Sequence, residues 1–69
     1  MDRMKAVGNR LKEARGNRTR AEIAGKAGIS LSAVQMYEDG KRVPRDAIKI
    51  KLARVLGKSV EELFYPDFF

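Results

Sequence analysis

The chain has 69 residues, enough for one domain whose folding buries only roughly 60% of the surface that the unfolded chain exposes. It contains no cysteine and no histidine, which excludes disulfide bonds, thiolate metal sites and the most common general base. The formal net charge of +6 favours a polyanionic partner, with nucleic acid ahead of an anionic membrane.

Apolar residues recur every three or four positions from the N-terminus, which is the period of an α-helix. The first predicted helix carries a stripe of Met4, Val7, Leu11 and Ala14. It ends near Arg15, because Gly16 and Asn17 form a stop signal. Thr19 and Glu22 then have the spacing of a capping box, which predicts a second helix that ends at Gly28.

The third predicted helix is short, with Ser30 as its cap and Gly40 at its end. Val34 and Tyr37 are three residues apart and are predicted to face inward. Pro44 starts or immediately precedes a fourth helix, because its missing N–H costs nothing at that position. The predicted core stripe of this helix is Ile48, Leu52, Ala53 and Leu56. Lys49, Lys51 and Arg54 are expected to form a solvated face, with contact to DNA as the alternative.

A second capping box at Ser59 and Glu62 predicts a short fifth helix. No alternating pattern is long enough to compete as a strand. Five short helices with short connections predict an all-α fold, a compact five-helix bundle that occupies residues 1–69 as a single domain.

The second and third helices together, about residues 19–39, have the spacing of a near-perpendicular helix–turn–helix pair. Such a pair projects its second helix from the domain, and a helix fits the major groove of B-DNA. The outward side of this helix carries Ser32, Gln35, Met36 and Asp39, with Leu31 at its N-terminal edge. Gln35 can pair with adenine, Ser32 with several bases, and Leu31 or Met36 can contact a thymine methyl group. The alternatives are plain solvated surface for Ser32 and Gln35, and packing onto the domain edge for Leu31 and Met36.

Charge is unevenly distributed along the chain. Residues 1–20 carry a net charge of +5 and residues 41–58 a net charge of +6, whereas residues 21–40 sum to −2. The third helix therefore lies between two basic segments that can bind phosphates. Phosphate contacts position a protein on DNA without reading the base sequence.

The stretch "TRAEIAGKAGISLSAVQMYEDGKRVP", followed by "IKLARVLGKSVEELF", resembles the Cro/repressor-type helix-turn-helix domain, also called XRE-like. The resemblance implies a lambda-repressor-like fold of five helices, binding to double-stranded operator DNA, and a homodimer with two-fold symmetry. It places Leu31, Ser32, Gln35 and Met36 at base-reading positions and Arg20, Ser30, Lys41 and Arg42 at phosphate contacts. Arg15 and Glu38 fall on a pair that often forms a buried ion pair in the family. Arg20 stands where the family commonly has glutamine.

The C-terminal residues Phe64, Tyr65, Phe68 and Phe69 are too apolar to be left exposed on so small a protein. We expect part of this C-terminal aromatic cluster to close the core and part to pack against a second copy.

These patterns predict a small transcriptional repressor that binds an inverted-repeat operator through its third helix. The alternative is an antitoxin or anti-repressor whose main partner is a protein. An enzyme is not expected, and neither is a metal, a cofactor or a small-molecule ligand. The chain has no apolar run of the roughly 20 residues needed to cross a bilayer and no secretory signal, so we expect a cytoplasmic protein with no membrane partner.

Overall fold

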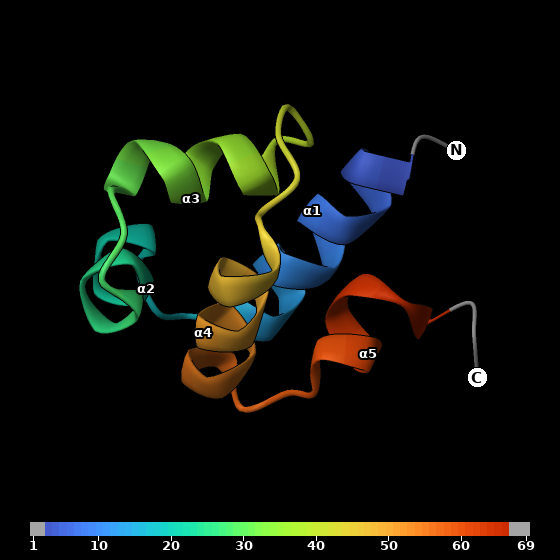
Figure 1. Cartoon of the computed structure of the whole chain (residues 1–69). Coiled ribbons are helices and arrows are strands. Elements are labelled where there is room, and N and C mark those ends of the chain that lie inside the picture. The colour runs from blue at the N-terminus through green and yellow to red at the C-terminus, as the bar shows by residue number, and fades with distance from the viewer. Residues whose placement is uncertain (1–2, 67–69) are drawn as a thin grey trace.

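The computed structural model describes residues 3–66, and five α-helices account for most of them. They are α1 (Arg3–Arg15), α2 (Arg20–Ala27), α3 (Leu31–Glu38), α4 (Asp46–Leu56) and α5 (Val60–Phe64). In Figure 1, α3 lies across the top of the domain, with α2 below its start and α4 and α5 lower down. No strand occurs in residues 3–66, so the predicted all-α five-helix fold is confirmed.

Both predicted capping boxes form. The Thr19 hydroxyl accepts a hydrogen bond from the Glu22 amide at 3.1 Å, and the Glu22 carboxylate accepts one from the Thr19 amide at 3.4 Å. Ser59 and Glu62 make the same reciprocal pair, with both bonds at 3.0 Å. The hydrogen bonds with Ser59 lower the pKa of the Glu62 carboxyl below its usual value. These bonds satisfy amides that the first turn of a helix leaves without partners, and they set where α2 and α5 begin.

The core takes side chains from all five helices, because each contributes its apolar stripe. Its buried members are Val7, Leu11, Ile23, Ala27, Tyr37, Leu52, Ala53, Leu56, Leu63 and Phe64. Val34 is also buried, whereas Ala14 and Ile48 lie half-buried at the edge of the core. Pro44 is buried too, and α4 begins two residues after it, with Arg45 at the N-cap.

Lys49 does not lie on a solvated face, and that prediction was wrong. Its side chain is only 11% exposed, and its Nζ atom lies 4.7 Å from the centre of the Tyr65 ring and 5.6 Å from that of Phe64. The two aromatic rings at the end of α5 cover the lysine, and cation–π attraction compensates part of its lost hydration. Lys51 and Arg54, by contrast, are exposed as predicted.

The backbones of α1 and α3 approach each other closely at Gly8. A Cβ atom on Gly8 would lie 2.3 Å from the carbonyl oxygen of Glu38 and 2.9 Å from that of Tyr37. Gly40, just after α3, faces α1 in a similar way, since a Cβ there would lie 2.9 Å from the Cα atom of Lys5. Glycine at both positions therefore lets the end of α3 pack directly against the first half of α1.

A buried carboxylate holds the same end of α3. The Glu38 side chain is 3% exposed and accepts hydrogen bonds from two arginines. Arg15 Nε lies 2.8 Å from Oε2 and its Nη2 lies 3.1 Å from Oε1, while Arg20 Nε lies 2.9 Å from Oε1. The Glu38 carboxylate raises the pKa of Arg15 above its already high ordinary value. The ion pair expected from the sequence is present as part of a group of three that joins α1, α2 and α3, here called the Glu38 triad.

Arg18 supports the triad from the short loop between α1 and α2. Its guanidinium donates to the carbonyl oxygens of Ala14, Arg15 and Val55 at 2.9–3.2 Å. The Arg18 carbonyl in turn accepts from Arg15 Nη1 at 2.9 Å. Carbonyls near the ends of α1 and α4 thereby gain partners, and the loop that leads to Arg20 is anchored to the core.

Two glycines inside helices offer a matched comparison. Gly8→Ala forces the backbones of α1 and α3 apart, and we expect it to lower the free energy of unfolding by about 2–3 kcal/mol. Gly25→Ala, where a Cβ atom meets nothing within 4 Å, should raise that free energy by roughly 0.5–1 kcal/mol through helix propensity. Urea unfolding followed by circular dichroism measures both. Equal effects of the two substitutions would show that the contact at Gly8 does not constrain the packing.

The Glu38 triad predicts unequal effects of its members. Arg15→Ala leaves a buried carboxylate with one partner, and we expect a loss of about 2–3 kcal/mol of stability. Arg20→Ala should cost less, because Arg15 makes two of the three bonds and is the less exposed. The double substitution should cost more than the sum of the two, since it leaves Glu38 without a cation. If chemical unfolding shows that the stability losses of the two single variants add up to that of the double variant, the two arginines do not share the Glu38 carboxylate.

Candidate nucleic-acid interface

The four predicted base-reading residues lie together on the exposed side of α3. Leu31, Ser32, Gln35 and Met36 are all exposed, and their spacing of one, four and five residues puts them on one side of a helix. The opposite side is buried through Val34, Tyr37 and Glu38. Two polar and two apolar side chains are therefore presented on a helix whose back is fixed to the domain.

Two of these four exposed side chains are apolar. Leu31 is 43% exposed and Met36 is 37% exposed, and they are two of the four exposed large hydrophobic residues described. Neither side chain is buried against the rest of the domain. Apolar groups on such a face can contact thymine methyl groups.

Ser30 is the N-cap of α3. Its hydroxyl oxygen accepts a hydrogen bond from the Ala33 amide at 3.0 Å, so the hydroxyl proton remains available to donate. Ser30 is exposed and lies at the positive end of the α3 dipole. These properties suit contact with an anionic group.

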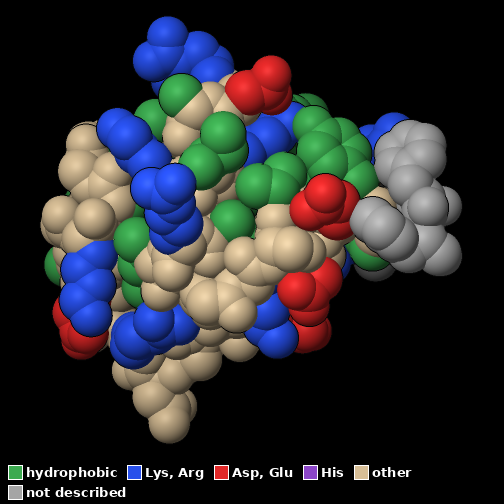
Figure 2. Space-filling model, turned by 60° about the horizontal axis from the view of Figure 1, so that its bottom comes forward, with side chains coloured by type: hydrophobic (Ala, Val, Ile, Leu, Met, Phe, Trp, Pro, Cys, Tyr) green, Lys and Arg blue, Asp and Glu red, His purple; other side chains and the backbone are tan. Residues whose placement is uncertain are grey.

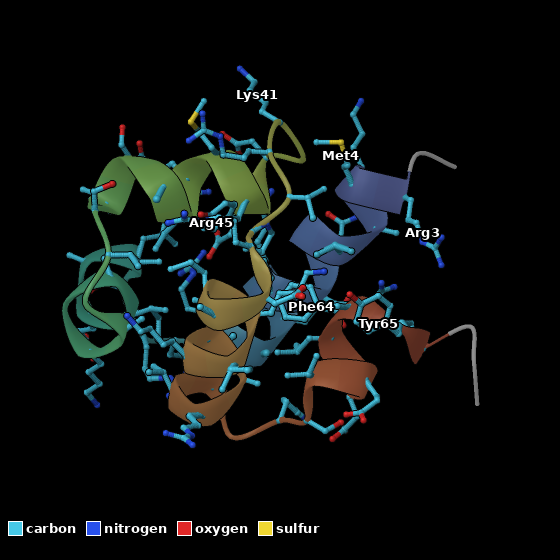
Figure 3. The ribbon with its side chains drawn as sticks, viewed as in Figure 1. Arg3, Met4, Lys41, Arg45, Phe64 and Tyr65 are labelled. Atoms are coloured by element: carbon cyan, nitrogen blue, oxygen red, sulfur yellow. The ribbon has the colours of Figure 1, made fainter. Side chains whose placement is uncertain are left out.

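The loop after α3 presents basic side chains. Gly40 has a φ of +71°, and the Lys41 amide donates to the Met36 carbonyl at 2.9 Å, which reverses the chain at the end of α3. Lys41 and Arg42 are both exposed, and Figure 3 shows Lys41 extending away from the body of the domain. Arg45, which the sequence did not single out, is a further exposed cation in this connection. Arg45 is the N-cap of α4 and directly follows Pro44, and nothing in the sequence around it indicates a DNA contact.

Arg20 has a more complex position than the sequence suggested. Its Nε atom belongs to the Glu38 triad, and its Nη2 atom lies 3.9 Å from Oδ1 of Asp39. The side chain is 31% exposed. The residue therefore has a structural partner on its inner side and solvent on its outer side.

The C-terminal aromatic cluster is divided. Phe64 is 3% exposed and is part of the core, so it closes the domain and has no surface to offer a second copy. Tyr65 is half-buried, and Phe68 and Phe69 lie outside the described residues.

A second apolar surface lies beside Tyr65. It includes Val43, which is 51% exposed, and Ile50, which is 48% exposed. Val43 lines a groove of about 170 Å³ together with Lys49 and Tyr65. Lys49 and Tyr65 also line a neighbouring hollow, together with Ile50. We call Val43, Ile50 and Tyr65 the Val43–Ile50 surface. Figure 2 shows hydrophobic side chains in a band across the upper part of the face turned toward the viewer.

Within residues 3–66 no three acidic side chains come together as a set that could hold a metal ion. No helix in the same range is both long enough and apolar enough to cross a bilayer.

Comparisons with known proteins identify the family of the chain. The family model for the helix-turn-helix domain matches residues 11–63, which include the Glu38 triad, all of α3 and most of α5. The cryptic phage CTXphi transcriptional repressor RstR of Vibrio cholerae serotype O1 is 38% identical over 47 residues. The aligned part covers 68% of this chain and 42% of that repressor. The chain therefore belongs to the helix-turn-helix family of the XRE type, whose members are DNA-binding regulators.

Proposed function

We propose that this chain is a sequence-specific repressor that inserts α3 into the major groove of an inverted-repeat DNA operator. The observation that carries the proposal is the division of α3 into two sides. Its inner side is fixed by Val34, Tyr37 and the Glu38 triad, while its outer side presents Leu31, Ser32, Gln35 and Met36. A rigid helix with exposed hydrogen-bonding and apolar groups suits the reading of base edges.

Basic residues around α3 supply the sequence-independent part of binding in this proposal. Ser30 lies at one end of α3, and Lys41, Arg42 and Arg45 follow its other end. Phosphates on either side of the groove would then be held by exposed cations and by the N-terminus of α3. Such contacts set the register in which α3 meets the bases.

A two-fold dimer is the second part of the proposal. The Val43–Ile50 surface is apolar and exposed, and none of the four base-reading residues of α3 lines its two grooves. If two copies join there, their α3 helices can enter successive major grooves on one side of the duplex. The similarity to a phage transcriptional repressor supports repression as the outcome of binding.

Selection of bound sequences from a random duplex pool at about 150 mM salt tests the function directly. We expect an inverted repeat whose half-site centres are about 10 base pairs apart. A selected site without inverted symmetry would contradict the dimer. No enrichment at all would favour the alternative of an antitoxin or anti-repressor that acts mainly on a protein.

Base contacts and phosphate contacts should respond differently to substitution. Gln35→Ala should weaken binding to the selected operator by about 1–3 kcal/mol and change binding to random DNA little. Lys41→Ala and Arg42→Ala should weaken binding to both, and each should reduce the slope of log affinity against log salt by about 1. Fluorescence anisotropy with both duplexes makes the measurement. If Gln35→Ala reduces affinity equally for all sequences, α3 does not read bases through Gln35.

The dimer surface can be tested separately. Ile50→Asp should shift sedimentation toward the monomer and weaken operator binding, while the melting temperature changes little, because Ile50 is 48% exposed. Asn9→Asp, also at an exposed position, introduces the same charge change on α1 as a control. Deletion of Phe68 and Phe69 should weaken dimerisation more than folding. If Ile50→Asp sediments like the unmodified chain, the dimer forms through another surface.

A further inference from the structure

The two arginines of the Glu38 triad are used in different ways. Arg15 donates from Nε, Nη1 and Nη2, so all three of its nitrogens have acceptors inside the domain. Arg20 donates to Glu38 from Nε alone. Among residues 3–66, Nη1 and Nη2 of Arg20 have no hydrogen-bond acceptor. Arg20 is therefore a cation whose orientation is set on its inner side and whose outer side can still bind.

The charges of the triad do not cancel. One carboxylate faces two guanidinium groups, so Glu38 with Arg15 is balanced and the charge of Arg20 remains. The nearest further anion is Asp39, whose Oδ1 atom lies 3.9 Å from Arg20 Nη2. This distance is too long for a hydrogen bond but still within the attraction of opposite charges. The Asp39 side chain is 44% exposed, so its attraction for Arg20 is weakened by water and can be replaced.

The negative charge of Asp39 is unfavourable at a surface that binds DNA. It is the C-cap residue of α3 and precedes the basic loop that carries Lys41 and Arg42. Its cap hydrogen bonds come from the backbone, so its carboxylate is not needed to end the helix. A phosphate that approaches Arg20 must both displace this carboxylate and lie near its negative charge.

We propose that Asp39 is an affinity-tuning residue that competes with a DNA phosphate for the outer nitrogens of Arg20. Glu38 positions Arg20, and Asp39 occupies it weakly when no phosphate is present. The affinity of the chain for any duplex is thereby reduced. A DNA site is then bound tightly only if its bases also make contacts with α3. This inference rests on the proposed function, because it requires that the chain bind duplex DNA.

A double-mutant cycle tests the competition. Asp39→Asn should raise affinity for random duplex and for the selected operator alike by about three- to fivefold at low salt, and less at higher salt. In the Arg20→Gln background the same substitution should change affinity by less than about 1.5-fold, because the competed cation is gone. Glu61→Gln makes the same charge change at an exposed position of α5 and controls for the overall electrostatic field of the chain. Anisotropy titrations of all four variants and the unmodified chain supply the values.

Arg20→Lys keeps the experiment decisive if Arg20→Gln unfolds. Lysine carries its donors on one nitrogen at the end of a shorter side chain, so it cannot hold Glu38 with one nitrogen and offer two others to a phosphate, and the gain from Asp39→Asn should be clearly smaller in this background than in the unmodified chain. Equal gains in every background would show that Asp39 acts only as a general repelling charge. A change on one DNA sequence alone would show that it reads a base, and either result overturns the competition. If the unmodified chain binds no duplex at all, the proposed function itself fails.

Discussion

The buried carboxylate of Glu38 is the interaction on which the rest of this domain depends. A side chain that is 3% exposed must have its charge compensated, and two guanidinium groups from α1 and from the start of α2 do so. Gly8 allows the backbone of α1 to approach the same end of α3. Because one end of α3 is held by both polar and steric contacts, its outer side is presented at a fixed angle to the domain.

The net charge of +6 overstates the charge available to a partner. Arg10 donates to the Leu63 carbonyl, Arg18 to three carbonyls, and Arg15 to Glu38 and the Arg18 carbonyl. Lys49 lies against aromatic rings. In a chain with so small a core, these long side chains tie helix ends together as well as carrying charge. The cations that matter for binding in the proposed function are those left at the surface beside α3, namely Lys41, Arg42 and Arg45, together with the outer side of Arg20.

Exposed apolar side chains also fall into two sets with different implications. Leu31 and Met36 lie on α3 beside polar groups, a mixture suited to base edges and thymine methyl groups. Val43 and Ile50 border grooves that share Lys49 and Tyr65, a continuous apolar surface suited to a second copy. In the proposed dimer the first set contacts DNA and the second set packs against the other copy.

The helices could be predicted from the sequence because the signals that define them are local. These signals are the capping boxes at Thr19 and Ser59, the glycines at helix ends, and the apolar stripes at helical spacing, and each acts within a few residues. The exposed side of α3 followed from the same periodicity. What only the tertiary structure decided concerns groups distant in sequence. Arg20 meets Glu38 18 residues away, Arg18 reaches Val55, and Lys49 lies under Tyr65. Long, flexible side chains choose these partners only after the helices have packed, so no spacing in the sequence indicates them.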